Sequence, residues 1–290
     1  MRVKVYVLDS FTKAKSGGNP AGVVLGADGF SESDMKRIAM MAGFPETAFI
    51  QQSDKADFKT RFFTPNSEVD LCGHATIAAF SMLAKMGIIK EGKYMQETKA
   101  GILDIELHED GKIFMTQNPP RFFERADRKN VVRCLNISEK QLLPELPIQI
   151  VSTGLRDILV PIKNMKTLLS IRPNFEEISK ISKKYHSIGF HVFTLETKFG
   201  STAHCRNFAP LYGIPEESAT GTANGALGCY LFKHGVITKE QAGSLVFEQG
   251  YSIGRPSEIL VKLDVEGNKI KQVKVGGIAG KTKETEVVIS

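Results

Sequence analysis

The sequence lacks the features that define several classes of protein. No apolar run reaches the ~18 residues that a membrane-spanning helix needs. The N-terminus alternates Val3, Val5 and Val7 with polar residues, as a strand does, and shows no apolar core of a signal peptide. The cysteines lie far apart, without CxxC or Cys/His zinc spacing, at Cys72, Cys134, Cys205 and Cys229. These absences exclude a disulfide scaffold and predict a cytoplasmic protein with no metal site and no membrane partner.

Charge of one sign is not concentrated anywhere along the chain. The 38 Lys and Arg against 32 Asp and Glu leave a net charge of +6, and no basic run is denser than Lys183-Lys184. This scatter predicts that nucleic acid is not a partner and at most favours small acidic ligands. The composition, 42% hydrophobic and 24% charged over 290 residues, is that of an ordinary globular protein of roughly two domains.

The chain contains an internal repeat far longer than the periods of solenoid proteins. Leu71–Ile89 aligns with Ala219–Ile237, at an offset of 148, with seven identities in nineteen positions, where average residue usage gives about one by chance. Three further pairs follow the same order: Arg61–Pro65 with Arg206–Pro210, Gly43-Phe44 with Gly189-Phe190, and Ile102–Ile113 with Glu258–Lys269. The order indicates duplication of a unit of roughly 120–150 residues, a plausible domain size.

Each repeat is predicted to be rich in strands, with one buried helix. The first helix begins near His74 and ends at Gly87, and it is apolar on nearly every face, as is its counterpart Thr222–Lys233. Amphipathic helices are expected at Asp34–Ala42, capped by Ser31, and at Phe175–Lys184. Strands are expected in the first repeat at Val3–Leu8, Ala21–Leu25, Thr47–Gln51, Lys59–Thr64, Tyr94–Glu97, Ile102–Leu107 and Lys112–Gln117.

Both buried helices begin with a small, glycine-containing turn, Cys72-Gly73-His74-Ala75 and Thr220-Gly221-Thr222-Ala223. The first amides of a helix have no internal partner and lie at the positive end of its dipole, so they favour carboxylate or enolate oxygens. If the two repeats pack face to face, both helix starts open into one cleft. The alternative is that the glycines merely shape tight turns between strand and helix.

Three ionisable side chains lie next to these helix starts. Glu46 stands in an apolar strand-like run, where burial is expected to raise its pKa toward the range of general acid–base catalysis. His74 lies at a helix N-terminus, where the dipole is expected to keep its ring neutral. Glu217 directly precedes the second helix start. The plain alternatives are an edge-strand glutamate, a capping histidine and a helix N-terminal carboxylate.

Motifs that bind nucleotides or form a nucleophile elbow are missing. No GxGxxG follows a strand, and neither a Walker motif nor GxSxG occurs. His204 and Cys205 are adjacent in a predicted strand, so their side chains point to opposite faces and do not form a thiol–base pair. The sequence therefore favours proton transfer without a cofactor.

Five motifs, in this order, resemble the PhzF-like family of phenazine-biosynthesis-type isomerases. They are Gly18–Leu25 (GNPAGVVL), Glu46–Phe49 (ETAF), Arg61–Pro65 (RFFTP), Cys72–Thr76 (CGHAT) and Thr220–Asn224 (TGTAN). The later Gln249-Gly250 and Gly254–Ser257 (GRPS) are also similar to that family, so the resemblance covers essentially the whole chain.

The resemblance implies an α+β, diaminopimelate-epimerase-like fold. In this fold two pseudo-symmetric domains, each a curved, mostly antiparallel sheet wrapped around a central helix, enclose the active site. We expect one domain at 1–125, completed by a C-terminal strand within 280–290, and a second at 126–279, with the crossing near 125–133. The family is typically homodimeric, takes part in biosynthesis and uses no cofactor.

The resemblance also implies roles for particular residues. Glu46 matches the acid/base that moves a proton between substrate carbons, His74 a residue that assists it, and Glu217 a catalytic aspartate. The expected contacts to a small carboxylate-bearing substrate are Asn19, Cys72, Gly73, Ala75, Thr220, Gly221 and Thr222.

The sequence departs from the family pattern before the second helix. The usual Glu-Asp-Pro-Ala-Thr-Gly-Ser is Glu216–Thr222 (EESATGT) here. An acid longer by one methylene shifts its carboxyl group by about one carbon–carbon bond, enough to affect catalysis. We therefore expect a substrate other than dihydro-hydroxyanthranilate.

Three functions remain open from the sequence. The first is a cofactor-independent isomerase in which Glu46 moves a proton next to a carboxylate. The second is an epimerase or dehydratase with one thiol, Cys72, because Thr220 replaces the second cysteine that two-thiol racemases need. The third is a non-catalytic protein that binds a small acid in the same cleft.

Overall fold

The computed structural model describes residues 1–13 and 16–289, which divide into two compact units. Unit 1 comprises Met1–Thr116 and Gly276–Ser290, and unit 2 comprises Gln117–Val275. Residues 125–133, where the sequence predicts the domain crossing, form the end of a strand and most of a helix in unit 2. The predicted domain boundaries stay a prediction, and of the segments they include, residues 14–15 and 290 lie outside the described part of the chain.

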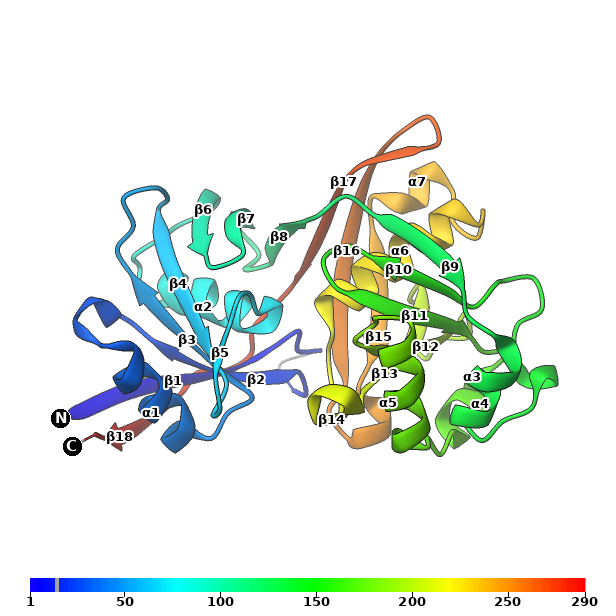
Figure 1. Cartoon of the computed structure of the whole chain (residues 1–290). Coiled ribbons are helices and arrows are strands. Elements are labelled where there is room, and N and C mark those ends of the chain that lie inside the picture. Colours follow the sequence, from blue (N-terminus) through cyan, green and yellow to red (C-terminus); the bar gives the residue numbers. More distant parts are fainter. Residues whose placement is uncertain (14–15, 290) are drawn as a thin grey trace. The chain divides into compact units, whose positions relative to one another are not determined.

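Unit 1 is a mixed sheet with two helices and one 3-10 turn (Figure 1). The strands β1 and β2 are antiparallel, β2 and β3 parallel, β3 and β4 antiparallel, β4 and β6 parallel, and β6, β7 and β8 antiparallel. The short β5 pairs with β4, and the C-terminal β18 pairs with β1. The elements are β1 (Arg2–Ser10), β2 (Asn19–Val24), η1 (Ala27–Gly29), α1 (Glu32–Ala42), β3 (Glu46–Gln51), β4 (Phe58–Phe63), β5 (Glu68–Val69), α2 (Gly73–Lys85), β6 (Gly92–Thr98), β7 (Gly101–Leu107), β8 (Ile113–Gln117) and β18 (Lys283–Val288).

Unit 2 repeats the same order of pairings. The strands β10 and β11 are antiparallel, β11 and β12 parallel, β12 and β13 antiparallel, β13 and β15 parallel, and β15 and β16 antiparallel. The short β14 pairs with β13 as β5 does with β4, and β9 pairs with β10 as β18 does with β1. The elements are β9 (Arg121–Arg125), α3 (Arg128–Cys134), η2 (Glu139–Gln141), β10 (Gln149–Ser152), β11 (Arg156–Pro161), α4 (Met165–Ser170), α5 (Phe175–Lys184), β12 (Gly189–Thr194), β13 (Ala203–Ala209), η3 (Pro210–Tyr212), β14 (Ile214–Glu217), α6 (Gly221–Lys233), α7 (Lys239–Ala242), β15 (Leu245–Gln249), η4 (Tyr251–Ile253), β16 (Ser257–Glu266) and β17 (Lys269–Gly277).

The strand registers agree with all but one of the repeated sequence segments. Arg61 lies opposite Phe49 on β3, and Arg206 lies opposite Val192 on β12. Phe49 and Val192 are therefore equivalent positions, and the residues three positions before them, Glu46 and Gly189, are equivalent too. The predicted pairing of Gly43-Phe44 with Gly189-Phe190 is wrong. Gly43 caps the end of α1 with φ 70°, whereas Gly189 begins a strand; the two-residue match arose by chance.

Each unit is organised around one helix that is buried on all sides. In α2 every residue from His74 to Leu83 is buried, and in α6 every residue from Ala223 to Leu231 is buried. Phe80, Leu83, Leu227 and Leu231 are each at most 2% exposed. The predicted α+β class with one enclosed helix per unit is confirmed. Among the described residues, no helix is both long and apolar enough to span a membrane.

An arginine–glutamate pair holds the loop before each buried helix. In unit 1, Arg61 donates from Nε and Nη2 to Glu68, at 2.7 and 2.9 Å, and in unit 2 Arg206 donates in the same way to Glu216, at 2.9 and 2.8 Å. Each guanidinium also lies over the phenylalanine two residues later in its strand. Since the two forked pairs connect β4 to β5 and β13 to β14, they fix both hairpins that lead into the helix starts.

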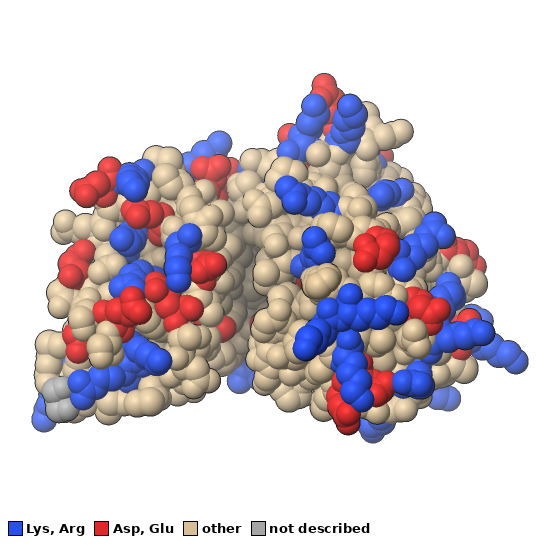
Figure 2. Space-filling model, in the orientation of Figure 1, with Lys and Arg blue, Asp and Glu red and all other residues tan. Residues whose placement is uncertain are grey.

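Acidic and basic side chains are interspersed over both units on the face that Figure 2 shows. Exposed ion pairs occur in both units, such as Lys4 with Glu284 at 2.9 Å and Lys180 with Glu176 at 2.7 Å. Exposed pairs of this kind contribute little to stability, typically below about 1 kcal/mol. The scatter of charge along the sequence is thus also a scatter over this surface.

Asp157 and His191 are buried in unit 2, and both are uncharged near neutral pH. Burial, together with the nearby Glu217 carboxylate, raises the pKa of Asp157 to about 8, although its hydrogen bond with Asn207 favours the ionised form. Burial lowers the pKa of His191 to about 4. Asn207 donates to Nδ1 of this ring at 3.2 Å, and Nε2 donates to Asn224 at 3.3 Å.

The buried Asp157 predicts a particular pH dependence of stability. Its pKa is higher in the folded state than in the unfolded chain, so the folded state binds more protons between about pH 4 and 8. The stability contribution of this group is therefore lost as the pH rises, by up to about 1.4 kcal/mol per pH unit. Asp157→Asn cannot ionise, and its free energy of unfolding relative to wild type should increase from pH 5 to pH 8 in urea titrations. Asp264→Asn, on an exposed position of β16, is the matched control; a parallel pH dependence for Asp157→Asn and wild type would contradict the assignment.

Candidate active site

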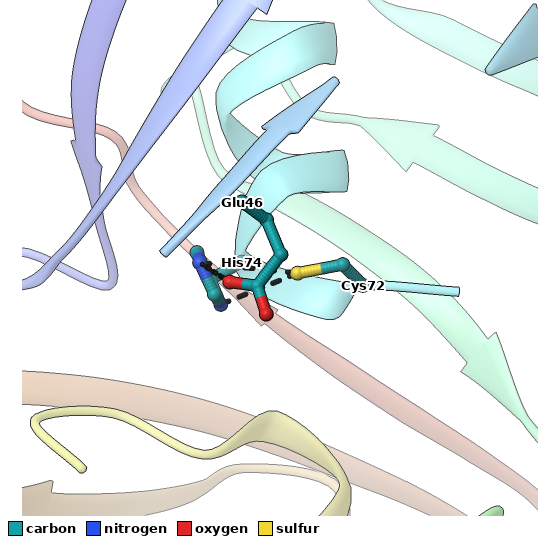
Figure 3. A group of neighbouring side chains, drawn as sticks. All are labelled: Glu46, Cys72 and His74. Carbon is teal, nitrogen blue, oxygen red and sulfur yellow. Dashed lines mark hydrogen bonds and ion pairs between the residues drawn. The ribbon is translucent and has the colours of Figure 1, made fainter. Parts of the chain in front are cut away.

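The first helix start brings together three chemically reactive side chains (Figure 3). Glu46 is the first residue of β3, Cys72 is the N-cap of α2, and His74 is the second residue of α2. Cys72 has an extended backbone, with φ −139°, and so marks the point where the chain turns into the helix. The parallel register that sets Glu46 beside Ala21 places the acid at this end of the sheet.

Glu46 and His74 form a close, largely buried ion pair. His74 Nε2 lies 3.0 Å from Glu46 Oε2, and the two side chains are 7% and 18% exposed. Although this distance is short, Oε2 has no hydrogen bond of good geometry within the described residues. We therefore describe the contact as an ion pair that leaves an oxygen lone pair of Glu46 available to another partner.

The environment of Glu46 differs from the sequence prediction. Burial alone raises the pKa of Glu46, as expected, but the charge of His74 and the close polar contacts with His74 and Cys72 outweigh it and leave the pKa below its usual value. The predicted net upward shift is therefore wrong. The sequence analysis underestimated the influence of His74, which lies 28 residues away along the chain but within 3.0 Å of Glu46 in the fold.

His74 differs from the prediction in the corresponding way. Burial lowers the pKa of His74, but the neighbouring Cys72 and Glu46 raise it well above the ordinary value. The expectation that the helix dipole keeps the ring neutral is wrong, because the contacts with Cys72 and with the Glu46 carboxylate at 3.0 Å together outweigh the helix end. Burial and the Glu46 charge also raise the pKa of Cys72. Glu46 and His74 therefore each favour the charged form of the other, while burial and the Glu46 charge favour the protonated thiol of Cys72.

The other predicted residues of unit 1 hold the histidine in place. The side-chain amide nitrogen of Asn19 lies 3.3 Å from His74 Nδ1, and Cys72 Sγ lies 3.4 Å from the same atom. Ser10, which the sequence did not single out, donates its hydroxyl to the His74 carbonyl at 2.6 Å. Ser10 faces Asn19 across the β1–β2 pair, so two neighbouring strands fix the backbone and the ring of one residue.

Gly73 and Ala75 present backbone groups rather than reactive side chains beside Cys72 and His74. A Cβ on Gly73 would meet the end of the flexible Met115 side chain at 2.9 Å, so the position is crowded from the core side. The Ala75 side chain is fully buried, and its backbone amide lowers the pKa of Cys72, though less than burial raises it. Neither side chain can contact a substrate directly.

The second helix start forms its own hydrogen-bonded group in unit 2. Thr220 donates its hydroxyl to Glu217, and Gln249 donates to the Thr220 hydroxyl at 3.0 Å and to the Glu217 carbonyl at 2.9 Å. Thr222 accepts a hydrogen bond at its carbonyl from Thr153, at 3.1 Å. Gly221 is the first helical residue.

Two buried residues that hold this group together were not predicted as site residues. Asn224 donates to the Thr220 carbonyl and to Gln249, each at 2.8 Å, and both Asn224 and Gln249 are fully buried. The sequence contained a signal for Asn224, because burying an asparagine within an apolar helix costs free energy unless its side chain is hydrogen-bonded. His204 and Cys205 have separate partners, Glu248 and Asn224, as their opposite strand faces predict.

The structure thus describes two groups of predicted residues, one in each unit. Glu46, Cys72 and His74 are in mutual contact with Asn19 beside them, and Glu217, Thr220 and Thr222 lie at the start of α6. That both helix starts open into one cleft stays a prediction.

Comparisons with known proteins agree with the sequence motifs. The family model described as phenazine biosynthesis-like protein (PhzC-PhzF) matches residues 8–285. An uncharacterized isomerase of Clostridium acetobutylicum is 38% identical over 100% of this chain and 99% of its own. The trans-2,3-dihydro-3-hydroxyanthranilate isomerase of Pseudomonas chlororaphis is 28% identical over 93% of this chain and 94% of its own.

Solved structures agree with the fold. The phenazine biosynthesis protein of the PhzF family from Bacillus anthracis superposes with a TM-score of 0.89 at 35% identity, covering 100% of both chains. A hydroxyproline epimerase from Agrobacterium vitis has a TM-score of 0.65 at 15% identity, over 99% of this chain and 94% of its own, which shows a shared fold alone. Because the family model spans nearly the whole chain and close relatives are named isomerases, this chain belongs to the phenazine biosynthesis-like (PhzC-PhzF) family and is an isomerase.

Proposed function

We propose that this isomerase moves a proton next to a carboxylate on a small acidic metabolite, without a cofactor, and that Glu46 carries the proton. The observation that supports this most strongly is the buried Glu46–His74 pair, in which Oε2 has no aligned hydrogen bond. A shielded carboxylate with a free lone pair is a suitable general base, because it has little hydration to lose before it accepts a proton.

The proposed reaction is redox-neutral and needs neither an oxidant nor a reductant. Glu46 takes a proton from a substrate carbon beside the carboxylate, and the electron pair of the broken C–H bond enters an enolate. Glu46 then returns the proton to a carbon of the same intermediate, and the enolate electrons form the new C–H bond. The substrate is isomerised, and Glu46 is again a carboxylate.

His74 and the helix start provide the electrostatic part of the proposal. The imidazolium keeps Glu46 ionised before the reaction, since it lowers the pKa of that carboxyl group. The first amides of α2 lie at the positive end of a helix of thirteen residues, where enolate or carboxylate oxygens are stabilised. Glu217 and Thr222, at the start of α6, are proposed to bind the same substrate.

The comparisons support a carboxylate substrate but not one particular compound. The Pseudomonas chlororaphis relative is named for a hydroxyanthranilate, which is a carboxylate. Glu217, where the family pattern has aspartate, is engaged by the Thr220 hydroxyl. We propose that this longer acid favours a different small acid in this protein.

The proposal also covers assembly and location. A homodimer follows from the family resemblance, and a cytoplasmic location follows from the sequence. The cysteines Cys72, Cys134, Cys205 and Cys229 are all free and buried, as in a protein kept reduced.

Glu46→Gln should abolish proton transfer but retain binding. The amide keeps the size and hydrogen-bonding reach of the acid but cannot carry the proton, so exchange should fall by about 10²–10⁴-fold. Ligands are first found by thermal shift against a library of small carboxylic acids, and solvent deuterium incorporation is then followed by NMR. Glu91→Gln, an exposed glutamate of unit 1, is the control. Full exchange in Glu46→Gln would refute the role of Glu46.

Cys72→Ala and His74→Asn separate the carboxylate mechanism from the thiol mechanism. Because burial keeps the thiol protonated, Cys72→Ala should retain much of the exchange, whereas His74→Asn should lose it by ~10-fold or more as Glu46 loses its cationic partner. Exchange lost in Cys72→Ala but kept in Glu46→Gln would assign the reaction to the thiol. Ligand binding without exchange for every ligand found would favour the binding-protein reading.

Substitution of the neighbouring acids Glu216 and Glu217 should affect stability and activity differently. Glu216 neutralises Arg206, a guanidinium only 5% exposed, so Glu216→Gln should destabilise the fold by about 3–5 kcal/mol in urea titrations. Glu217 accepts a hydrogen bond from the Thr220 hydroxyl, which a glutamine side-chain oxygen can also accept, so Glu217→Gln should lower kcat/KM with a smaller loss of stability. Equal losses of stability in the two variants, with kcat/KM preserved in Glu217→Gln, would remove Glu217 from the proposed site.

A further inference from the structure

The two late sequence motifs, Gln249-Gly250 and Gly254–Ser257, form one tight turn at the end of β15. Gln249 is the last residue of that strand. Gly250 and Gly254 both have a left-handed backbone, with φ 81° and 69°. The backbone amide of Arg255 donates to the Gly250 carbonyl at 3.0 Å and closes the turn. Both Gln249 and Gly250 lie against the loop of residues 217–220, which connects β14 to α6.

Gln249 contacts this loop at three points. Its amide nitrogen donates to the Glu217 carbonyl at 2.9 Å and to the Thr220 hydroxyl at 3.0 Å. Its side-chain oxygen accepts a hydrogen bond from the Thr220 backbone amide at 3.3 Å. The Thr220 hydroxyl, which accepts from Gln249, donates its own proton to the Glu217 carboxylate. One side chain thus connects both ends of the loop and, through Thr220, the carboxylate of Glu217.

Gly250 lies close to the middle of the same loop. A Cβ at this position would be 2.6 Å from the carbonyl oxygen of Ser218 and 2.2 Å from that of Arg255. A Cβ on Gly254, by contrast, would meet nothing within 4 Å. Both glycines relieve the strain of a left-handed backbone, but Gly250 in addition allows the loop to approach closely.

A chain of buried side chains fixes the orientation of the Gln249 amide. Asn207 donates to Nδ1 of His191 at 3.2 Å, and Nε2 of that ring donates to Asn224 at 3.3 Å. Asn224 in turn donates to the Gln249 side-chain oxygen at 2.8 Å. Reversing the Gln249 amide would set two N–H donors against each other. Since all four residues are at most 1% exposed, the chain holds Gln249 rigidly against the loop.

Unit 1 has no such chain at the equivalent strand positions. Ala48 lies opposite Phe62 where His191 lies opposite Asn207 in unit 2. Apolar side chains therefore satisfy the same strand pairing in unit 1. Buried polar groups cost free energy unless they are hydrogen-bonded. The polar chain of unit 2 is thus not a requirement of the fold, which indicates a role at the start of α6.

We propose that Gln249 and Gly250 are positioning residues of this isomerase, which hold the loop of residues 217–220 so that the Glu217 carboxylate keeps its place at the start of α6. Neither residue is proposed to touch the substrate. The consequence for the reaction rests on the proposed role of Glu217, whereas the support of the loop does not.

The support of the loop is tested without substrate, by the ¹³C NMR signal of the Glu217 carboxyl group, which is assigned by its loss in Glu217→Gln. The signal should shift in Gln249→Met and in Gly250→Ala. It should stay in place in two matched controls, Gln149→Met, at another buried glutamine of unit 2, and Gly254→Ala. Thermal unfolding shows which variants are folded, and Gln249→Met decides if Gly250→Ala is not. An unchanged signal in either folded variant would overturn the proposal.

The role in the reaction is tested with the deuterium-exchange assay. Gln249→Met should lower kcat/KM by about 10-fold or more, because small displacements of a catalytic or binding group are costly, whereas Gln149→Met should stay near wild type. In the Glu217→Gln background, Gln249→Met should cause little further loss, since it acts through Glu217. Losses that multiply, or an unchanged kcat/KM in Gln249→Met, would remove Gln249 from the positioning role. If the carboxyl signal shifts as expected but no ligand undergoes exchange, the support of the loop stands and the proposed function fails.

Discussion

The need to bury a helix that is apolar on every side governs the structure of each unit. Neither α2 nor α6 has a polar face along its buried turns, so neither can lie on a surface. The strands of each unit therefore have to surround the helix, and the pairings of β1–β7 and β10–β16 achieve this in the same order. Reactive polar side chains can then lie only near the ends of the helix. The reactive groups accordingly gather at the helix starts, where unpaired amides favour anions.

Duplication preserved the framework of the two helix starts but not their chemistry. The forked pairs Arg61–Glu68 and Arg206–Glu216 recur with nearly the same distances. Glu46, by contrast, is replaced by Gly189, where no side chain fits against Phe208. Cys72 and His74 are replaced by two threonines. The acid, the imidazole and the thiol therefore occur together in unit 1, whereas the start of α6 presents hydroxyl groups, Glu217 and buried amides.

Contacts across the chain decide the charges at the first helix start. Burial alone favours a neutral Glu46 and a neutral His74, yet side by side each stabilises the charged form of the other. The same pairing explains why Cys72, despite its place at a helix start, stays protonated: the Glu46 carboxylate and burial both oppose a thiolate. The site is best treated as one coupled group of three residues rather than as three independent side chains.

The sequence by itself determined the fold class, the duplication, the two buried helices and most of the residues at their starts. Hydrophobic periodicity, glycines at helix ends and repeated motifs are patterns of neighbouring residues, so they can be recognised from the sequence without tertiary information. Tertiary structure decided which strand position in unit 2 matches Glu46, that Ser10, Asn224 and Gln249 belong to the helix-start groups, and how Glu46 and His74 are charged. Those properties depend on distances of about 3 Å between residues far apart in sequence. A shift of one residue in strand register changes which side chains meet, and one neighbouring charge can reverse the direction of a pKa shift.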